Sequence, residues 1–168
     1  MSIPPLTPLA AAVLRVGQPE RVLQLECGEG DGVLFLAREF PQARVRGLDR
    51  SARAVRAAQD RVGLDPEGRV AFKVGRPGAL PFPDDHFDLV AALDATPRPA
   101  EIARVLRPGG FLVLAWSERS RAPRGPRRRL LDWSLRRARI DRLAEEDAGD
   151  GSFALARLGG GGTRPGAG

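Results

Sequence analysis

The sequence of 168 residues predicts an α/β fold, namely a doubly wound, mostly parallel sheet that ends in a C-terminal antiparallel hairpin. Two observations predict it. Short apolar runs typical of buried strands alternate with segments whose apolar residues recur every three or four positions, as in helices that cover a sheet. The length suits a single compact domain with its own core, and 42% hydrophobic with 29% charged residues is an ordinary composition for a globular protein.

The first two thirds of the chain contain five apolar runs that we expect to form parallel strands. They span residues 21–25, 43–48, 70–74, 87–93 and 111–115. A short helix-like stretch precedes the first run, at 9–15. Between the runs, one helix should end at Pro41, a second should begin at a Ser51 cap and stop at Gly63, and a third should cover 101–106 before Pro108-Gly109-Gly110 ends it.

Beyond Trp116 the pattern is weaker. Residues 119–129 read as a basic loop interrupted by prolines, and residues 130–138 suit a helix. Residues 139–143 and 152–158 are expected to pair as the closing hairpin. The glycine-rich segment 159–168 has too few apolar residues to fold, so we expect a domain over 1–158 and a disordered tail over 159–168.

The formal net charge of +6 raises the question of a nucleic-acid partner. Lys73 is the only lysine, and alanine, glycine and proline are plentiful, which favours a compositional bias spread over solvated faces. Only residues 119–129 concentrate the charge. We therefore expect no nucleic-acid partner. Because the sequence has no long apolar run and no basic leader, we also expect neither a membrane span nor a signal peptide. With Cys27 as the single cysteine, the expected location is the cytoplasm.

A glycine-rich turn joins the first predicted strand to the next helix, in the segment VLQLECGEGDG at 22–32. Glycines allow a sharp turn and a close approach by a ligand. Dinucleotide-binding loops have the spacing G-x-G-x-x-G, whereas this one has G-x-G-x-G with Glu29 and Asp31 between the glycines, and these acids would repel a pyrophosphate. Asp49 ends the second strand about twenty residues after Gly30, where an acid can accept hydrogen bonds from a ribose. The alternative role for Asp49 is that of an acid at a helix N-terminus beside Ser51.

Two further segments complete a set of linked motifs: LPFPDDHFDLV at 80–90 and EIARVLRPGG at 101–110. Over residues 21–115 the chain resembles the class I S-adenosylmethionine-dependent methyltransferases, in particular the small-molecule, type 11-like group. The resemblance implies a Rossmann-like fold, S-adenosylmethionine as the cofactor, a small-molecule methyl acceptor, and a monomer or homodimer. We assign no metal ligands.

The resemblance also implies the cofactor-binding residues. They are Glu26, Cys27, Gly28, Gly30, Asp49, Arg50, Gly75, Arg76 and Leu93. The family loop reads acid-x-Gly-x-Gly-x-Gly, and two registers fit it. The spacing to Pro41 and Asp49 favours the register that puts Gln24 at the acid and Glu26 at the first glycine. Glu26 would then either clash with the methionine end of the cofactor or pair with its ammonium group.

Other departures concern the adenine and the acceptor. Arg76 stands where the family has an acceptor for the adenine amino group, and a guanidinium only donates. The segment 91–100 is shorter than in relatives and leaves Asp94 as the candidate catalytic base. His86 is interpreted as a turn residue and Cys27 as a small residue that fills the loop. Trp116 and Trp133 are interpreted as residues that pack in the core or cover it. Three functions remain: a small-molecule methyltransferase, a cofactor-binding relative with weak or lost catalysis, and a nucleic-acid methyltransferase.

Overall fold

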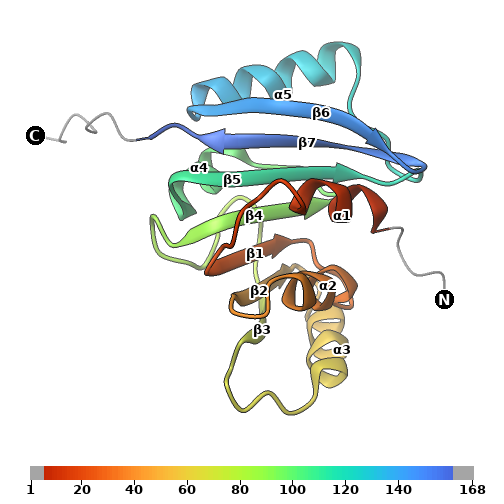
Figure 1. The fold of residues 1–168 in the computed structure, drawn as a ribbon, viewed down its shortest axis with the longest axis vertical. Helices are drawn as coiled ribbons and strands as arrows, with labels where there is room; N and C mark the ends of the chain where they lie inside the picture. Colours follow the sequence, from red (N-terminus) through yellow and green to blue (C-terminus); the bar gives the residue numbers. More distant parts are fainter. Residues whose placement is uncertain (1–5, 161–168) are drawn as a thin grey trace, which may run out of the picture.

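A single seven-stranded sheet organises the protein, a computed structural model of which describes residues 6–160. The strand order is β3-β2-β1-β4-β5-β7-β6, with β1 to β5 parallel and β7 antiparallel to both of its neighbours (Figure 1). The strands are β1 (Arg21–Leu25), β2 (Arg44–Asp49), β3 (Val70–Val74), β4 (Phe87–Leu93), β5 (Leu106–Trp116), β6 (Ile140–Ala148) and β7 (Gly151–Leu158). The predicted α/β class, the parallel sheet and the closing hairpin are all confirmed.

Helices cover both faces of the sheet, as the doubly wound prediction requires. They are α1 (Thr7–Val13), α2 (Asp31–Glu39), α3 (Ala52–Val62), α4 (Pro99–Val105) and α5 (Gly125–Arg137). One apolar core joins α1, α2 and α3 to the sheet through residues such as Leu9, Leu36 and Val55. A second core on the opposite face joins α4 and α5 through Ile102 and Leu135. The two cores make one compact domain.

Strand β5 is longer than predicted, because Pro108-Gly109-Gly110 lies inside it instead of ending α4 in a turn. Leu106 already pairs with Phe87, and the register then shifts so that Phe111 faces Leu89. Gly109 allows this irregularity with a φ of +81°, a backbone conformation open to glycine. The carbonyl of Gly109 accepts a hydrogen bond from Arg157 Nε at 2.9 Å. The irregularity is therefore tied to β7 as well as to β4.

The basic segment 119–129 is only partly the loop that the sequence predicted, because α5 already begins at Gly125. Arg128 explains the difference, since its guanidinium pairs with Asp132 on the same helix and with Glu145 on β6. Arg142 pairs with the same two acids. Strand β6 continues to Ala148, beyond the predicted end at 143, because it pairs with β7 as far as Ala148 opposite Gly151.

The glycine-rich tail predicted at 159–168 falls mostly outside the described residues, which end at Gly160. The elements from α1 to β7 all pack on the one sheet within the predicted domain of 1–158. Within residues 6–160, no helix combines the length and the apolar character that crossing a bilayer requires.

Candidate cofactor and acceptor site

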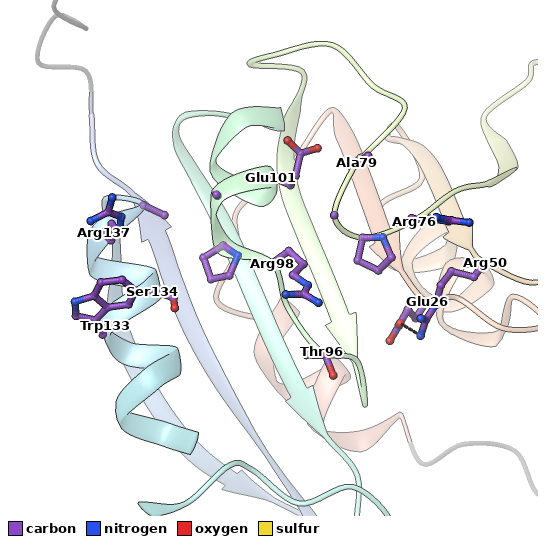
Figure 2. A pocket seen from close by; sticks show the side chains of 15 residues that line it. Glu26, Arg50, Arg76, Ala79, Thr96, Arg98, Glu101, Trp133, Ser134 and Arg137 are labelled. Atoms are coloured by element: carbon purple, nitrogen blue, oxygen red, sulfur yellow. Dashed lines mark hydrogen bonds and ion pairs between the residues drawn. The ribbon is translucent and has the colours of Figure 1, made fainter. Parts of the chain in front are cut away.

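A cavity of about 1330 Å³ opens at the carboxyl ends of the parallel strands (Figure 2). It lies where β1 neighbours β4 and the strand order reverses, which is the place where open α/β sheets bind their ligands. The residues that follow β1, β2 and β3 form one wall, and the segments around α4 and α5 form the other. Those used below are Glu26, Arg50 and Arg76 on the strand side, and Arg98, Trp133 and Arg137 on the helix side.

The glycine-rich loop adopts the backbone conformations for which glycine is suited. Gly28 and Gly30 have φ values of +54° and +91°, and Gly30 is the N-cap of α2. A Cβ atom at Gly30 would also lie 3.0 Å from the Phe72 ring and 3.1 Å from Ala58. By contrast, nothing lies within 4 Å of the position of a Cβ at Gly28. The loop is therefore packed against the core at Gly30 and open at Gly28.

Asp49 fastens this loop to the end of β2. Its Oδ2 accepts a hydrogen bond from the Gly28 N–H at 2.9 Å, and its Oδ1 accepts one from the Ser51 N–H at 2.9 Å. Ser51 caps α3 by accepting from the Ala54 N–H at 3.2 Å, as the sequence predicted. Asp49 thus has the structural role that was its alternative. Each carboxylate oxygen keeps a second lone pair, which a ribose hydroxyl could use.

Glu26 occupies the first position of the loop with a φ of +50°, a conformation that residues other than glycine rarely adopt. Its Oε1 accepts a hydrogen bond from Arg50 Nη2 at 2.9 Å, and the two side chains form an ion pair at the rim of the cavity (Figure 2). The Arg50 side chain is 67% exposed and that of Glu26 is 23% exposed. The arginine can therefore move away with little loss of packing, whereas the carboxylate is more enclosed.

Gln24, at the position of the family's acid, is buried in β1. Its Oε1 has no hydrogen-bond partner among the described residues. Gly32 lies in the first turn of α2, and a Cβ there would overlap the Gln24 amide. Gly32 therefore makes room for Gln24, while Gly28 and Gly30 form the turn itself.

Cys27 packs as a small core residue beneath the loop. Burial, assisted by the negative charge of Asp49, raises the pKa of the Cys27 thiol to about 12. A neutral, buried thiol is a poor nucleophile, which agrees with Cys27 as a small residue that fills the loop. Its Sγ lies 2.9 Å from the place where Gly47 would carry a Cβ, which shows how closely β2 approaches it.

The remaining predicted cofactor residues lie around the ends of β3 and β4. Arg76 lines the cavity, is exposed, and has no ion-pair or hydrogen-bond partner for its guanidinium among residues 6–160. Gly75 donates its N–H to the Asp49 carbonyl at 2.9 Å, and Leu93 is half-buried against the core. Of the predicted set, the structure brings Glu26, Arg50 and Arg76 to the cavity wall, with Asp49 directly behind Gly28.

Asp94, the candidate base, is engaged elsewhere. Its Oδ1 accepts from the Ser117 N–H at 2.7 Å and its Oδ2 from the Ser117 Oγ at 2.5 Å, so it joins the ends of β4 and β5. It is not part of the cavity wall. His86 precedes β4 at the opposite end of the sheet, where burial and the charges of Arg21 and Arg107 lower its pKa. Neither side chain is placed to accept a proton in the cavity.

The helix-side wall was missed by sequence reasoning, apart from Trp133 as a cover residue. Trp133 is 53% exposed, and the guanidinium of Arg137 lies over its ring at 5.5 Å from the centroid. Their four-residue spacing on a helix was a signal that they share a face. That this face would border α4 and the ends of the strands depends on how α5 packs, which the local sequence pattern does not contain.

The architecture and this site define the class of protein as a Rossmann-like methyltransferase fold. Comparisons with known proteins identify the family. Residues 22–110 match the family model described as "Methyltransferase domain". The chain is 37% identical over 101 residues to a fatty-acid O-methyltransferase of Mycolicibacterium smegmatis, covering 56% of this chain and 36% of the relative. It is 34% identical over 114 residues to the ubiquinone/menaquinone biosynthesis C-methyltransferase UbiE of Geobacter sulfurreducens, covering 62% and 44%.

A solved S-adenosylmethionine-dependent methyltransferase from Aquifex aeolicus superposes with a TM-score of 0.72 at 19% identity, over 91% of this chain and 90% of that one. This likeness supports the fold. The chain belongs to the methyltransferase-domain family, whose cofactor is S-adenosylmethionine. It matches less than half the length of the two curated relatives.

The residues present fit that cofactor. The open space over Gly28 leaves room for a ligand along the loop, and Asp49 retains acceptor capacity beside it. Glu26 and Arg50 offer one negative and one positive group at the same rim, and the amino-acid end of the cofactor carries both an ammonium and a carboxylate. The exposed Arg50 can exchange its partner when that end arrives.

Proposed function

We propose that this chain transfers the methyl group of S-adenosylmethionine to a nucleophilic O, N, C or S atom of a small molecule. The observation that carries the proposal is the cavity at the carboxyl ends of the strands, bordered by the residues that follow β1, β2 and β3 on one side and by α4 and α5 on the other. Its volume of about 1330 Å³ exceeds the roughly 300–1000 Å³ of a site for one drug-sized ligand. A cofactor and an acceptor can share it.

In this proposal Asp49 accepts from the ribose, the Glu26 carboxylate holds the ammonium group, and Arg50 turns to the carboxylate. When bound, the cofactor supplies an electrophilic methyl group on a sulfonium. The chain's contribution is to hold the acceptor in line with that group, because positioning alone can provide a large part of such rate enhancements.

Among residues 6–160, no unpaired carboxylate and no imidazole lines the cavity. Glu26 is paired with Arg50, and Glu101 accepts hydrogen bonds from Arg104 and from the Leu80 N–H. Asp94 is held by Ser117 and lies outside the cavity wall, so it is not placed to act as a base there. The proposal therefore favours an acceptor that is already ionised or that loses its proton to water, and the diverse acceptors in the relatives' names leave its identity open.

Isothermal titration calorimetry with S-adenosylmethionine and with its demethylated product tests the cofactor site. We expect both to bind, and Asp49→Ala to abolish the signal. An absence of binding at millimolar ligand would overturn the proposal. Transfer itself is tested by a screen of small-molecule acceptors that measures the demethylated cofactor.

Binding without turnover in that screen would favour the second candidate, a cofactor-binding relative with weak or lost catalysis. Two observations favour this candidate: the Glu26–Arg50 ion pair at the methionine end and the engagement of Asp94 by Ser117. Because Cys27 leaves no pair for a disulfide within the chain, we also propose that the protein works in the cytoplasm.

A further inference from the structure

We propose that the helix-side wall of the cavity binds the acid group of the methyl acceptor, a carboxylate or a phosphate, through Arg98 and Arg137. This inference rests on the proposed function, since it assigns the second ligand of the same cavity. It identifies the acceptor class as small organic acids.

The charge of the cavity wall is the first observation. Four arginines line it, against two glutamates. Both glutamates are already engaged, Glu26 by Arg50 and Glu101 by Arg104. Positive charge therefore remains uncompensated in the cavity. An anionic ligand would balance it, and burial between two walls would strengthen the attraction relative to open solvent.

Two of the cavity arginines differ from those elsewhere in the fold. Arg128 and Arg142 each pair with two acids. By contrast, the guanidiniums of Arg98 and Arg137 have no carboxylate partner within the described part of the chain. Surface arginines without partners also occur outside the cavity, so it is the position of these two on one wall that singles them out.

Their placement is the second observation. Arg98 is the N-cap of α4 and Arg137 ends α5, so the two helices of the helix-side wall each present one of them; in Figure 2 Arg98 lies near the middle of the cavity and Arg137 on α5 at its edge. Pro97 and Pro99 flank Arg98 and restrict the backbone that presents it, so the backbone loses little further freedom when a ligand binds. Arg50 and Arg76 follow β2 and β3, on the side assigned to the cofactor.

The third observation concerns the chemistry of the wall. A guanidinium offers two parallel N–H donors that match a carboxylate or a phosphate. The Arg137 guanidinium lies over the Trp133 ring at 5.5 Å from its centroid and is exposed, with no hydrogen-bond partner for its N–H groups among residues 6–160. The half-exposed Trp133 ring also gives an apolar surface beside the charges. The wall thus fits an acid that carries a flat or apolar body.

Calorimetric titration of the full chain with three probes tests this assignment: phenyl phosphate, phenylacetate and the neutral benzyl alcohol. Each is titrated into protein saturated with the demethylated cofactor. We expect both acids to bind at least about tenfold more tightly than the alcohol, as for a charge-assisted hydrogen bond. Tighter binding of phenyl phosphate would indicate a phosphate on the acceptor, and tighter binding of phenylacetate would indicate a carboxylate. Equal binding of the acids and the alcohol would overturn the proposal.

Arg98→Gln and Arg137→Gln should each weaken the binding of the acids about tenfold without changing that of the alcohol. Arg98→Lys keeps the charge and should recover only part of the lost affinity for the acids, because an ammonium group lacks the two parallel N–H donors of a guanidinium. The matched control is Arg136→Gln, which removes the same charge from the same helix but lies outside this cavity. A similar loss in Arg136→Gln would reduce the effect to overall charge and overturn the assignment.

Three further outcomes separate this proposal from the proposed function. If the cofactor does not bind but the acids bind through Arg98, methyl transfer fails and the acid site stands. If the acids bind only without the demethylated cofactor, the arginines hold the cofactor's own carboxylate, and the acceptor assignment fails. If single-stranded RNA displaces phenyl phosphate with a steep salt dependence, the wall is a nucleic-acid surface and the proposal is also overturned.

Discussion

Replacing Glu26 by glycine would put a glycine at the loop position where the resemblance implies the family's first glycine. We expect Glu26→Gly to leave the fold intact and to weaken the binding of S-adenosylmethionine. The physical reason is that the Glu26 carboxylate lines the cavity and is paired only with Arg50, whose side chain is 67% exposed. It can therefore pair with the ammonium group of the cofactor.

The expected change in stability is small because three terms nearly cancel. Glycine relieves the strain of the positive φ at Glu26, about 1 kcal/mol. It adds backbone entropy to the unfolded chain, which costs about 0.4–1 kcal/mol. The lost ion pair contributes about 0–1 kcal/mol, since the Arg50 side chain is 67% exposed. The net change stays within about 1 kcal/mol, a shift in Tm of roughly 2–4 °C.

The expected change in cofactor binding is larger. A hydrogen bond to a charged group contributes about 1.5–3 kcal/mol, which corresponds to roughly a 10- to 150-fold increase in Kd when it is lost. Titration calorimetry measures this directly. Glu26→Gln removes the charge while keeping the side-chain size, and Glu29→Gln is the matched control because that exposed acid has no assigned ligand. Tighter binding by Glu26→Gly than by the native chain would show that the side chain obstructs the cofactor, and would refute the reasoning.

Three other substitutions test the site and its frame. Asp49→Ala removes the acceptor of two backbone N–H groups and should lower the free energy of unfolding by about 2–3 kcal/mol in urea titrations, in addition to its effect on the cofactor; Asp49→Asn should lose less. Gly32→Ala should lower stability by about 1–3 kcal/mol, seen as a lower Tm, because the methyl group overlaps Gln24. The hydrogen bond from Arg104 holds the pKa of Glu101 below its ordinary value, so the ionised Glu101 side chain contributes to the free energy of unfolding at neutral pH. That contribution is lost as the pH falls from about 4.3, the ordinary pKa of a glutamate, through the lowered pKa of Glu101. Glu101→Gln should flatten that part of the acid unfolding curve, and an unchanged curve would contradict the assignment.

The strands and helices with a strong local pattern could be predicted from the sequence. The Ser51 cap and the Gly63 stop place α3, and the apolar runs place β1 to β4, because each depends on neighbours along the chain. The errors arose where distant partners decide the structure. Pro108-Gly109-Gly110 reads as a turn, but Leu106 before it and Phe111 after it both pair with β4, and the Arg157 side chain of β7 donates to the Gly109 carbonyl.

The same distinction applies to the site. Glu26, Arg50 and Arg76 could be placed near the cofactor because each follows a parallel strand, and such strands end at one edge of a sheet. Asp94 satisfies the same rule, yet Ser117 on the neighbouring strand end takes both of its oxygens. Arg137 could not be placed, because the packing of α5 alone brings it to the cavity.

The burial of Cys27 makes the chain its own reporter of loop opening. With its pKa raised to about 12 and its side chain packed between the loop and β2, the sole thiol can be alkylated only during excursions that expose it. The rate of labelling by a thiol reagent therefore measures how often the loop opens. Because Cys27 lies inside the glycine loop, a ligand that spans the loop should slow the alkylation of Cys27 in proportion to the ligand's occupancy. The measurement needs neither an attached probe nor a methyl acceptor.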